Sequence, residues 1–265
     1  MTDAADTHDA EPLDGDDAPE KTALQETVEI VKTVVYALLI ALVLRIFLFQ
    51  PFTIPSASMK PNLQVGDYVV TTKFTYGYSK HSIPFAPPLF KGRILAGQPK
   101  PGDIIVFNVP YSHKDLIKRL VGLPGDRVRV QDGVVFVNGK PLQRVYEGQG
   151  AVGACPNPEA IPRIYRETNA IGRSYVTYDC GVGPLDTTEE VLVPEGHYFM
   201  MGDNRDNSLD SRVIAEAGGA GLVPAENLVG KAQIILLSWD EEASLFKPWT
   251  WFLNARYGRF FHGLY

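Results

Sequence analysis

One apolar run constrains this chain more than any other feature. Residues 33–49 read TVVYALLIALVLRIFLF and carry a single charge, Arg45. With apolar flanks at 28–31 and 51–54, the run reaches the roughly 20 residues that an α-helix needs to cross a hydrocarbon core about 30 Å thick. Arg45 lies near one end, where its long side chain can reach the membrane interface. The pattern predicts a transmembrane anchor helix at residues 28–50.

A cleavable signal peptide and a buried core helix are the alternatives for such a run. A signal peptide usually has a basic start, a shorter apolar stretch and small residues at its exit. Here the first twenty residues carry eight Asp and Glu but no Lys or Arg, and the run closes on bulky Phe47, Leu48 and Phe49. An uncleaved anchor is therefore favoured. We expect residues 1–27 to form a disordered acidic tail.

The charge of the chain excludes one class of partner and leaves the topology open. The formal net charge of -6 argues against a nucleic-acid partner, which requires an excess of Lys and Arg. Lys21 and Lys32 precede the apolar run, while Lys60 and Lys73 follow it. Because the positive-inside count is nearly balanced, charge alone does not orient the anchor.

After the anchor, short β-type runs separated by some of the 24 Gly and 20 Pro replace the helical pattern. The predicted strands are 67–73, 103–109, 127–130, 133–137, 190–193, 197–201 and 231–239. The Asn138-Gly139 pair predicts a hairpin turn. Residues 143–188 are richer in turn residues and are interpreted as an insertion. The pattern predicts a mainly β, largely antiparallel protein.

The two cysteines, Cys155 and Cys180, both lie in this insertion. An even count fits one disulfide in an oxidising compartment, and it equally fits two unrelated buried thiols. Neither cysteine has a second Cys or His at metal spacing, so no metal site is expected.

Three polar segments carry candidate chemistry. Residues 49–63 read FQPFTIPSASMKPNL, and their prolines predict a stiff extended loop that would hold a serine nucleophile in place. An ordinary loop serine is the alternative. Residues 200–212 read MMGDNRDNSLDSR, a mixture typical of a turn held by side-chain hydrogen bonds and ion pairs. A solvated acidic loop is the alternative there.

The remaining segment, residues 115–126, reads DLIKRLVGLPGD. In a strand, Lys118 and Arg119 point to opposite faces, and both faces have aliphatic neighbours. We therefore expect one cation to be drawn toward the core. A desolvated lysine loses its proton more easily, whereas an arginine keeps its own. Lys118 is the candidate general base and Arg119 a candidate ion-pair residue.

The motifs PSASMKPNL, KRLVGLPGD and GDNRDNSLDSR, in this order after an apolar run, resemble bacterial signal peptidase I, also called leader peptidase. GDYVVTTKFTYG and PKPGDIIVF match that family too. The resemblance covers about residues 49–239 and is weakest between 143 and 188. It implies a membrane-bound endopeptidase with a Ser-Lys dyad that cuts signal peptides after Ala-X-Ala sites and uses no cofactor.

The resemblance also implies a role for each matching position. Ser58 would be the nucleophile, Lys118 the general base, and Ser56 the hydroxyl that joins the Ser58 backbone N–H in the oxyanion hole. Ser208 would orient the lysine amine, and Asp210 and Arg212 would form a buried pair that holds the loop. The pocket residues for small substrate side chains would be Ile54, Met59, Leu63, Leu116 and Ile117. Leu116 stands where the family often has an aromatic residue.

The family fold implies two antiparallel β-sheet lobes after one N-terminal transmembrane helix. The catalytic core would comprise residues 51–142 and 189–265, with residues 143–188 as the smaller, inserted lobe. The implied topology is a single-pass protein of the inner membrane, with a cytoplasmic tail and a periplasmic catalytic domain. Its partners would be signal peptides of exported preproteins and membrane lipid. The segment 249–265, which mixes aromatic residues with Arg256, Arg259 and His262, suits a bilayer interface, and equally a helix packed on the catalytic domain.

Other functions fit the residues less well. A self-cleaving Ser-Lys repressor would have a DNA-binding region where this chain has its apolar run. A β-lactamase or penicillin-binding protein would place a lysine three residues after the serine, and position 61 is proline. A membrane-tethered scaffold for export partners, with structural Ser and Lys, is the non-enzymatic alternative, and a peptide-cleavage assay separates it from the protease.

Overall fold

A computed structural model describes residues 22–83, 91–109, 114–240, 243, 247 and 249–264. The chain divides into two compact units, residues 1–42 and 43–265, and each is described by itself. The predicted acidic tail lies outside the described residues up to position 21. The second unit contains every candidate site residue.

The apolar run forms α1, Ala23–Phe47, a helix of 25 residues with a mean hydropathy of 2.3 in its most apolar window and no buried residue. It starts earlier than the predicted boundary at 28, so residues 23–27 are helical and not part of a disordered tail. The reason is a capping box: Thr22 N donates to Gln25 Oε1 at 3.0 Å, and Gln25 N donates to Thr22 Oγ1. The helix ends before the predicted residue 50, because Phe49 already pairs with Thr72 in a β-ladder.

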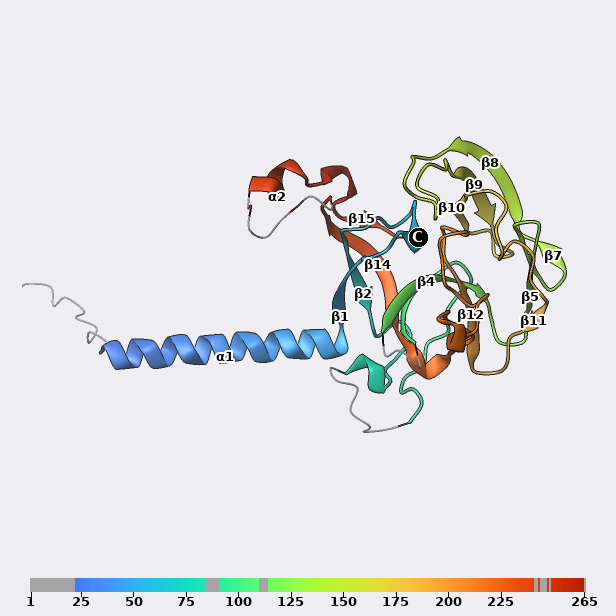
Figure 1. The fold of residues 1–265 in the computed structure, drawn as a ribbon. Coiled ribbons are helices and arrows are strands. Elements are labelled where there is room, and N and C mark those ends of the chain that lie inside the picture. The colour runs from blue at the N-terminus through green and yellow to red at the C-terminus, as the bar shows by residue number, and fades with distance from the viewer. Residues whose placement is uncertain are drawn as a thin grey trace, which may run out of the picture. The chain divides into compact units, whose positions relative to one another are not determined.

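The largest sheet of the second unit is antiparallel and has eight strands, in the order β1-β2-β14-β3-β4-β12-β13, with β15 also paired to β14. Their bounds are β1 Phe49–Thr53, β2 Asp67–Thr72, β3 Ile104–Asn108, β4 Asp115–Gly122, β12 His197–Met201, β13 Val223–Pro224, β14 Leu228–Ser238 and β15 His262–Gly263. The short β-type runs between Gly and Pro residues located β2, β3, β12 and β14 correctly. Figure 1 shows β14 running between β2 and β4.

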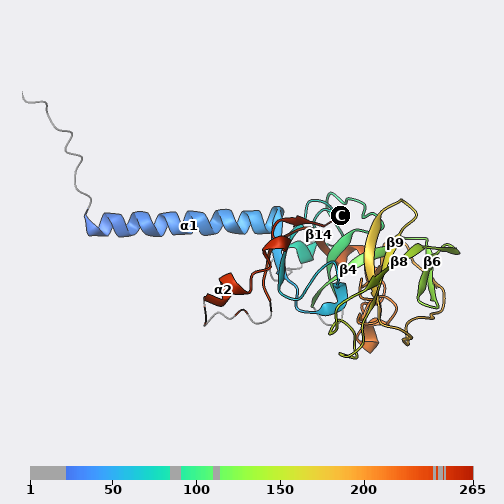
Figure 2. The same ribbon diagram turned by 90° about the horizontal axis from the view of Figure 1, so that it is seen from above.

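The described residues also form two smaller antiparallel sheets. One has the order β11-β5-β6-β7, formed by Val191–Leu192, Arg127–Gln131, Val134–Val137 and Lys140–Pro141. The other has the order β10-β9-β8, formed by Ser174–Asp179, Arg163–Thr168 and Gln143–Gln149. Figure 2 shows β8 and β9 side by side, with β6 beyond them.

The predicted hairpin turn is present, since Asn138 and Gly139 both have positive φ, 51° and 76°. The predicted mainly β fold of antiparallel sheets after an N-terminal apolar helix is confirmed, and the hairpin region adds a separate small sheet. It does so because β5 pairs with β11 and β6, and not with the large sheet. The predicted insertion, residues 143–188, contains all of the β8–β10 sheet.

Short helices connect these strands. They are η1 Ala57–Met59, η2 Lys80–Ser82, η3 Ala215–Ala217, η4 Ala225–Asn227, α2 Trp249–Leu253 and η5 Tyr257–Arg259. The two sides of β4 face different apolar clusters: Ile117 packs with Val106, and Leu116 packs against a second cluster that contains Phe107. Lys118 and Arg119 therefore lie within the hydrophobic core, and both are buried.

Candidate active site

Ser58 is held in η1, directly after the loop that follows β1. Pro55 removes a backbone donor, so the chain leaves the ladder there, and Lys60 N closes the turn on Ala57 O at 3.1 Å. Met59 and Leu63 are fully buried in the core. These two side chains anchor the turn, and Ser58 is buried at its centre with 7% of its surface exposed.

Lys118 reaches Ser58 from β4. Its Nζ lies 2.7 Å from Ser58 Oγ, and only 3% of the residue is exposed. Burial lowers the pKa of the Lys118 amine to about 8, against the opposing effect of the Asp210 and Asp203 carboxylates. An amine with this pKa is partly neutral near physiological pH, so it can accept the proton of a serine hydroxyl.

Ser56 lies beside the same hydroxyl. Its Oγ is 3.3 Å from Ser58 Oγ, and its side chain is exposed. A hydroxyl in this place can turn toward an oxygen that develops charge next to Ser58.

Residues 202–212, here called the catalytic loop, pack against the back of Ser58. Asn204 N donates to the Ser58 carbonyl at 3.0 Å. Gly202 fits because it has no side chain: a Cβ there would stand 2.6 Å from Ser58 O and 2.3 Å from Ser208 Oγ. The position of Ser58 therefore depends on the conformation of this loop.

The predicted ion pair of Asp210 and Arg212 is present in this loop, whereas the predicted contact of Ser208 with Lys118 is not. Asp210 and Arg212 form a buried ion pair, in which Arg212 Nη2 lies 2.8 Å from Asp210 Oδ2. Asp210 also accepts a hydrogen bond from Gly202 N at 2.9 Å. Ser208 Oγ is buried and lies near enough to Asp210 to help lower the pKa of that carboxyl, but among the described residues it makes no hydrogen bond of ordinary distance and angle. The contact from Ser208 to the lysine amine, which the resemblance implied, is therefore not made in this structure.

The residues expected to line substrate pockets do not form a single group. Ile54, Met59, Leu63 and Ile117 belong to one buried cluster. Leu116 packs against the cluster on the other side of β4.

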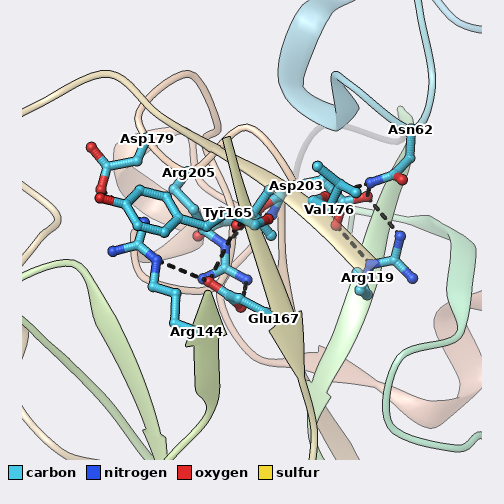
Figure 3. Close-up of polar contacts among 12 residues, drawn as sticks. Asn62, Arg119, Arg144, Tyr165, Glu167, Val176, Asp179, Asp203 and Arg205 are labelled. Atoms are coloured by element: carbon cyan, nitrogen blue, oxygen red, sulfur yellow. Dashed lines mark hydrogen bonds and ion pairs between the residues drawn. The ribbon is translucent and has the colours of Figure 1, made fainter. Parts of the chain in front are cut away.

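Sequence reasoning missed the partner of Arg119. Its guanidinium makes two hydrogen bonds of 2.7 Å to the Asp203 carboxylate, which also accepts one from Asn62 Nδ2 (Figure 3). Asn62 Nδ2 also donates to Val176 O at 2.7 Å. The pair joins the catalytic loop to β4 directly beside Lys118. The only signal in the sequence was the burial expected for one of two adjacent cations.

Comparison with known proteins identifies the family. A model of the family described as signal peptidase, peptidase S26, matches residues 27–239. The chain belongs to this signal peptidase family. It is 40% identical to a signal peptidase I of Rickettsia massiliae (strain Mtu5), covering 92% of this chain and 94% of that protein. It is also 40% identical to a signal peptidase I of Rickettsia typhi (strain ATCC VR-144 / Wilmington), covering 87% and 91%.

A crystal structure of a signal peptidase I from Enterococcus faecalis V583 is 29% identical to this chain, with a TM-score of 0.30, and covers 51% of this chain and 96% of that one. In the chain described here, α1 is the membrane anchor. It is the one helix among the described residues that is long and apolar enough to span a bilayer. A helix with an apolar stretch of this length and no buried residue requires an apolar surrounding.

The two cysteines of this signal peptidase form a disulfide that borders the catalytic loop. The carbonyl of Ala154, next to Cys155, accepts hydrogen bonds from the side-chain amides of Asn204 and Asn207. Cys180 N donates to Asp206 Oδ2 at 2.6 Å. Among the described residues, no group of three or more His, Cys, Asp or Glu side chains is arranged to hold a metal ion.

Proposed function

We propose that this protein is a membrane-anchored signal peptidase I that removes N-terminal signal peptides from exported proteins, with Ser58 as nucleophile and Lys118 as general base. One observation carries the assignment of these residues: a buried amine with a pKa of about 8 lies 2.7 Å from a serine hydroxyl. Membership of the family supplies the reaction, and this contact supports Ser58 and Lys118 as the residues that perform it.

The chemistry follows from the protonation states. Neutral Lys118 takes the proton of Ser58 Oγ as that oxygen attacks the scissile carbonyl carbon. The negative oxygen of the tetrahedral intermediate is stabilised by the Ser56 hydroxyl and the Ser58 backbone N–H. Lys118 then gives its proton to the leaving amine, which breaks the peptide bond. Lys118 next takes a proton from a water molecule as that water attacks the acyl-serine ester. The ester C–O bond breaks, the carboxylic acid product leaves, and Lys118 returns the proton to Ser58 Oγ.

The topology follows from the same assignment. The acidic tail lies in the cytoplasm, and the catalytic unit lies on the periplasmic face of the inner membrane, where exported proteins emerge. Support for lipid contact comes from the C-terminal segment. Trp249, Phe252 and Leu253 are 59%, 75% and 77% exposed. Aromatic and aliphatic side chains of this kind are favoured at the bilayer interface.

Cleavage of a preprotein with an Ala-X-Ala site by the purified protein in detergent tests the function. The wild type cuts the substrate, while folded Ser58→Ala and Lys118→Ala proteins do not, because nucleophile and base act as a unit. Lys140→Ala is the matched control, since that lysine is exposed on β7. Turnover by a folded Lys118→Ala protein would refute the dyad, and an inactive wild type would favour the scaffold alternative.

A further inference from the structure

A second buried ion pair lies behind the catalytic loop, between Glu167 on β9 and Arg205 in the loop. Arg205 Nη1 and Nη2 donate to the two Glu167 oxygens at 2.8 and 2.5 Å (Figure 3). Glu167 is 1% exposed and Arg205 is 4% exposed. Burial lowers the pKa of the Arg205 guanidinium, but the Glu167 carboxylate outweighs this and the net shift is upward. The Arg205 guanidinium therefore keeps its proton and its charge.

The guanidinium of Arg205 also fixes the backbone of its own loop. Its Nε donates to Gly202 O at 3.2 Å. Gly202 is the residue packed against Ser58 O and Ser208. The carbonyl of Arg205 accepts a hydrogen bond from Arg212, which also binds Asp210. A side chain on β9 is thus connected through Arg205 to both ends of the catalytic loop.

Backbone bonds hold the same loop to β10. Tyr178 N donates to Asp203 O at 2.8 Å, and Arg205 N donates to Tyr178 O at 2.9 Å. The turn-rich insertion therefore supplies a strand edge and a buried carboxylate to the loop that supports Ser58. Its third strand, β8, contributes Arg144, whose Nε lies 3.8 Å from Glu167 Oε1.

We propose that Glu167 is a positioning residue of the active site, which acts through Arg205 to hold the catalytic loop against Ser58. The inserted β8–β10 sheet then keeps Ser58 and Lys118 in place by holding the catalytic loop. This inference rests on the proposed function, because it takes Ser58 and Lys118 as the reacting pair. Glu167 touches neither substrate nor dyad, so its effect is on their geometry.

A pair on the same sheet provides the control. Glu147 on β8 and Arg166 on β9 also form two hydrogen bonds, but their side chains are 33% and 46% exposed and the pair lies outside the catalytic loop. Exposed pairs of this kind contribute little to stability. Glu147→Gln is therefore expected to keep wild-type kcat and KM.

The decisive variant is the double substitution Glu167→Met with Arg205→Met. Replacing both members of a buried ion pair by apolar residues of similar volume commonly preserves the fold, whereas removing one leaves an unpaired buried charge. We expect the double variant to fold, as measured by circular dichroism and thermal unfolding. Its kcat should fall about tenfold to a hundredfold with KM unchanged, because a loop that has lost its anchor misplaces Ser58.

Two single variants extend the test in the same assay. Glu167→Gln should lower kcat further, since Arg205 is left buried and unpaired. Glu167→Asp keeps the charge and should restore part of the kcat. A folded double variant with wild-type kcat would overturn the inference, and so would an equal loss in Glu147→Gln. If Ser58→Ala is inactive in the same assay, wild-type kcat in the double variant refutes only the positioning role of Glu167. Activity in Ser58→Ala would instead refute the proposed function.

Discussion

Lys118 Nζ and Ser58 Oγ lie 2.7 Å apart although 60 positions separate them in the chain. β4 carries the amine into the core, and η1 brings the hydroxyl to it. The same burial that places the amine lowers its pKa to about 8. Position and reactivity therefore have one physical cause, which makes the pair testable by pH as well as by substitution.

The pH dependence of cleavage should follow the Lys118 amine. The base works only when neutral, so kcat/KM should rise with pH through about 8 and then level. Lys73 offers a matched control, because burial also lowers its pKa to about 8 while its Nζ donates to Ser82 O, outside the dyad. Folded Lys73→Met should keep the wild-type profile. A kcat/KM that is flat across this pKa would contradict the assignment of Lys118.

Replacing Lys118 by an apolar residue should abolish cleavage and raise the free energy of unfolding. The Lys118 pKa is 10.5 in its ordinary state and about 8 in the folded protein, so the unfolded chain binds this proton more tightly. Stability from this group therefore rises with pH between the two values and is lowest below 8. Lys118→Met should be inactive and more stable at neutral pH by up to about 3 kcal/mol. Denaturant unfolding at two pH values measures this, and a gain that grows with pH would be the wrong sign.

The Ser56 hydroxyl should act in the transition state. We expect Ser56→Ala to lower kcat roughly a hundredfold, an effect of about 3 kcal/mol, with little change in KM. Steady-state kinetics on a preprotein substrate separate the two parameters. A change in KM alone would place the hydroxyl in substrate binding and remove it from the oxyanion hole.

The bridge between Cys155 and Cys180 should be detectable as missing thiols. Thiol titration of the unreduced, unfolded protein should find none. Because the bridge closes a loop with a separation of 25 residues, replacing both cysteines by Ala should lower the free energy of unfolding by about 3 kcal/mol on the chain-entropy model. Two titratable thiols would refute the bridge in the isolated protein.

Substrate choice should depend on small side chains. An enzyme that cuts many leaders can demand little beyond small residues at the first and third positions before the bond. We expect Ala-X-Ala substrates to be cut in detergent or lipid, and replacement of the Ala before the bond by Leu or Phe to stop cleavage. Rapid cleavage of those variants would show that Ile54, Ile117 and their neighbours do not form restrictive walls, and would leave the dyad untouched.

The sequence by itself determined the features that depend on neighbouring residues. An apolar run of membrane length predicts a helix wherever it occurs, and short runs rich in Val, Ile and Phe between turn residues predict strands such as β3 and β6. The motifs around Ser58 and Lys118 were sufficient to indicate the family. The helix start at Ala23 was also encoded locally, in the Thr22 and Gln25 capping box, although the apolar pattern alone placed it at 28.

Only the tertiary structure decided which charged groups meet. Arg119 finds Asp203 across 84 positions, and Arg205 finds Glu167 across 38. Nothing in the local sequence distinguishes Glu167 from Glu147, which is exposed on the adjacent strand of the same sheet. The difference arises from register and packing: one carboxylate faces the catalytic loop and is desolvated, so it requires a partner, while water solvates the other.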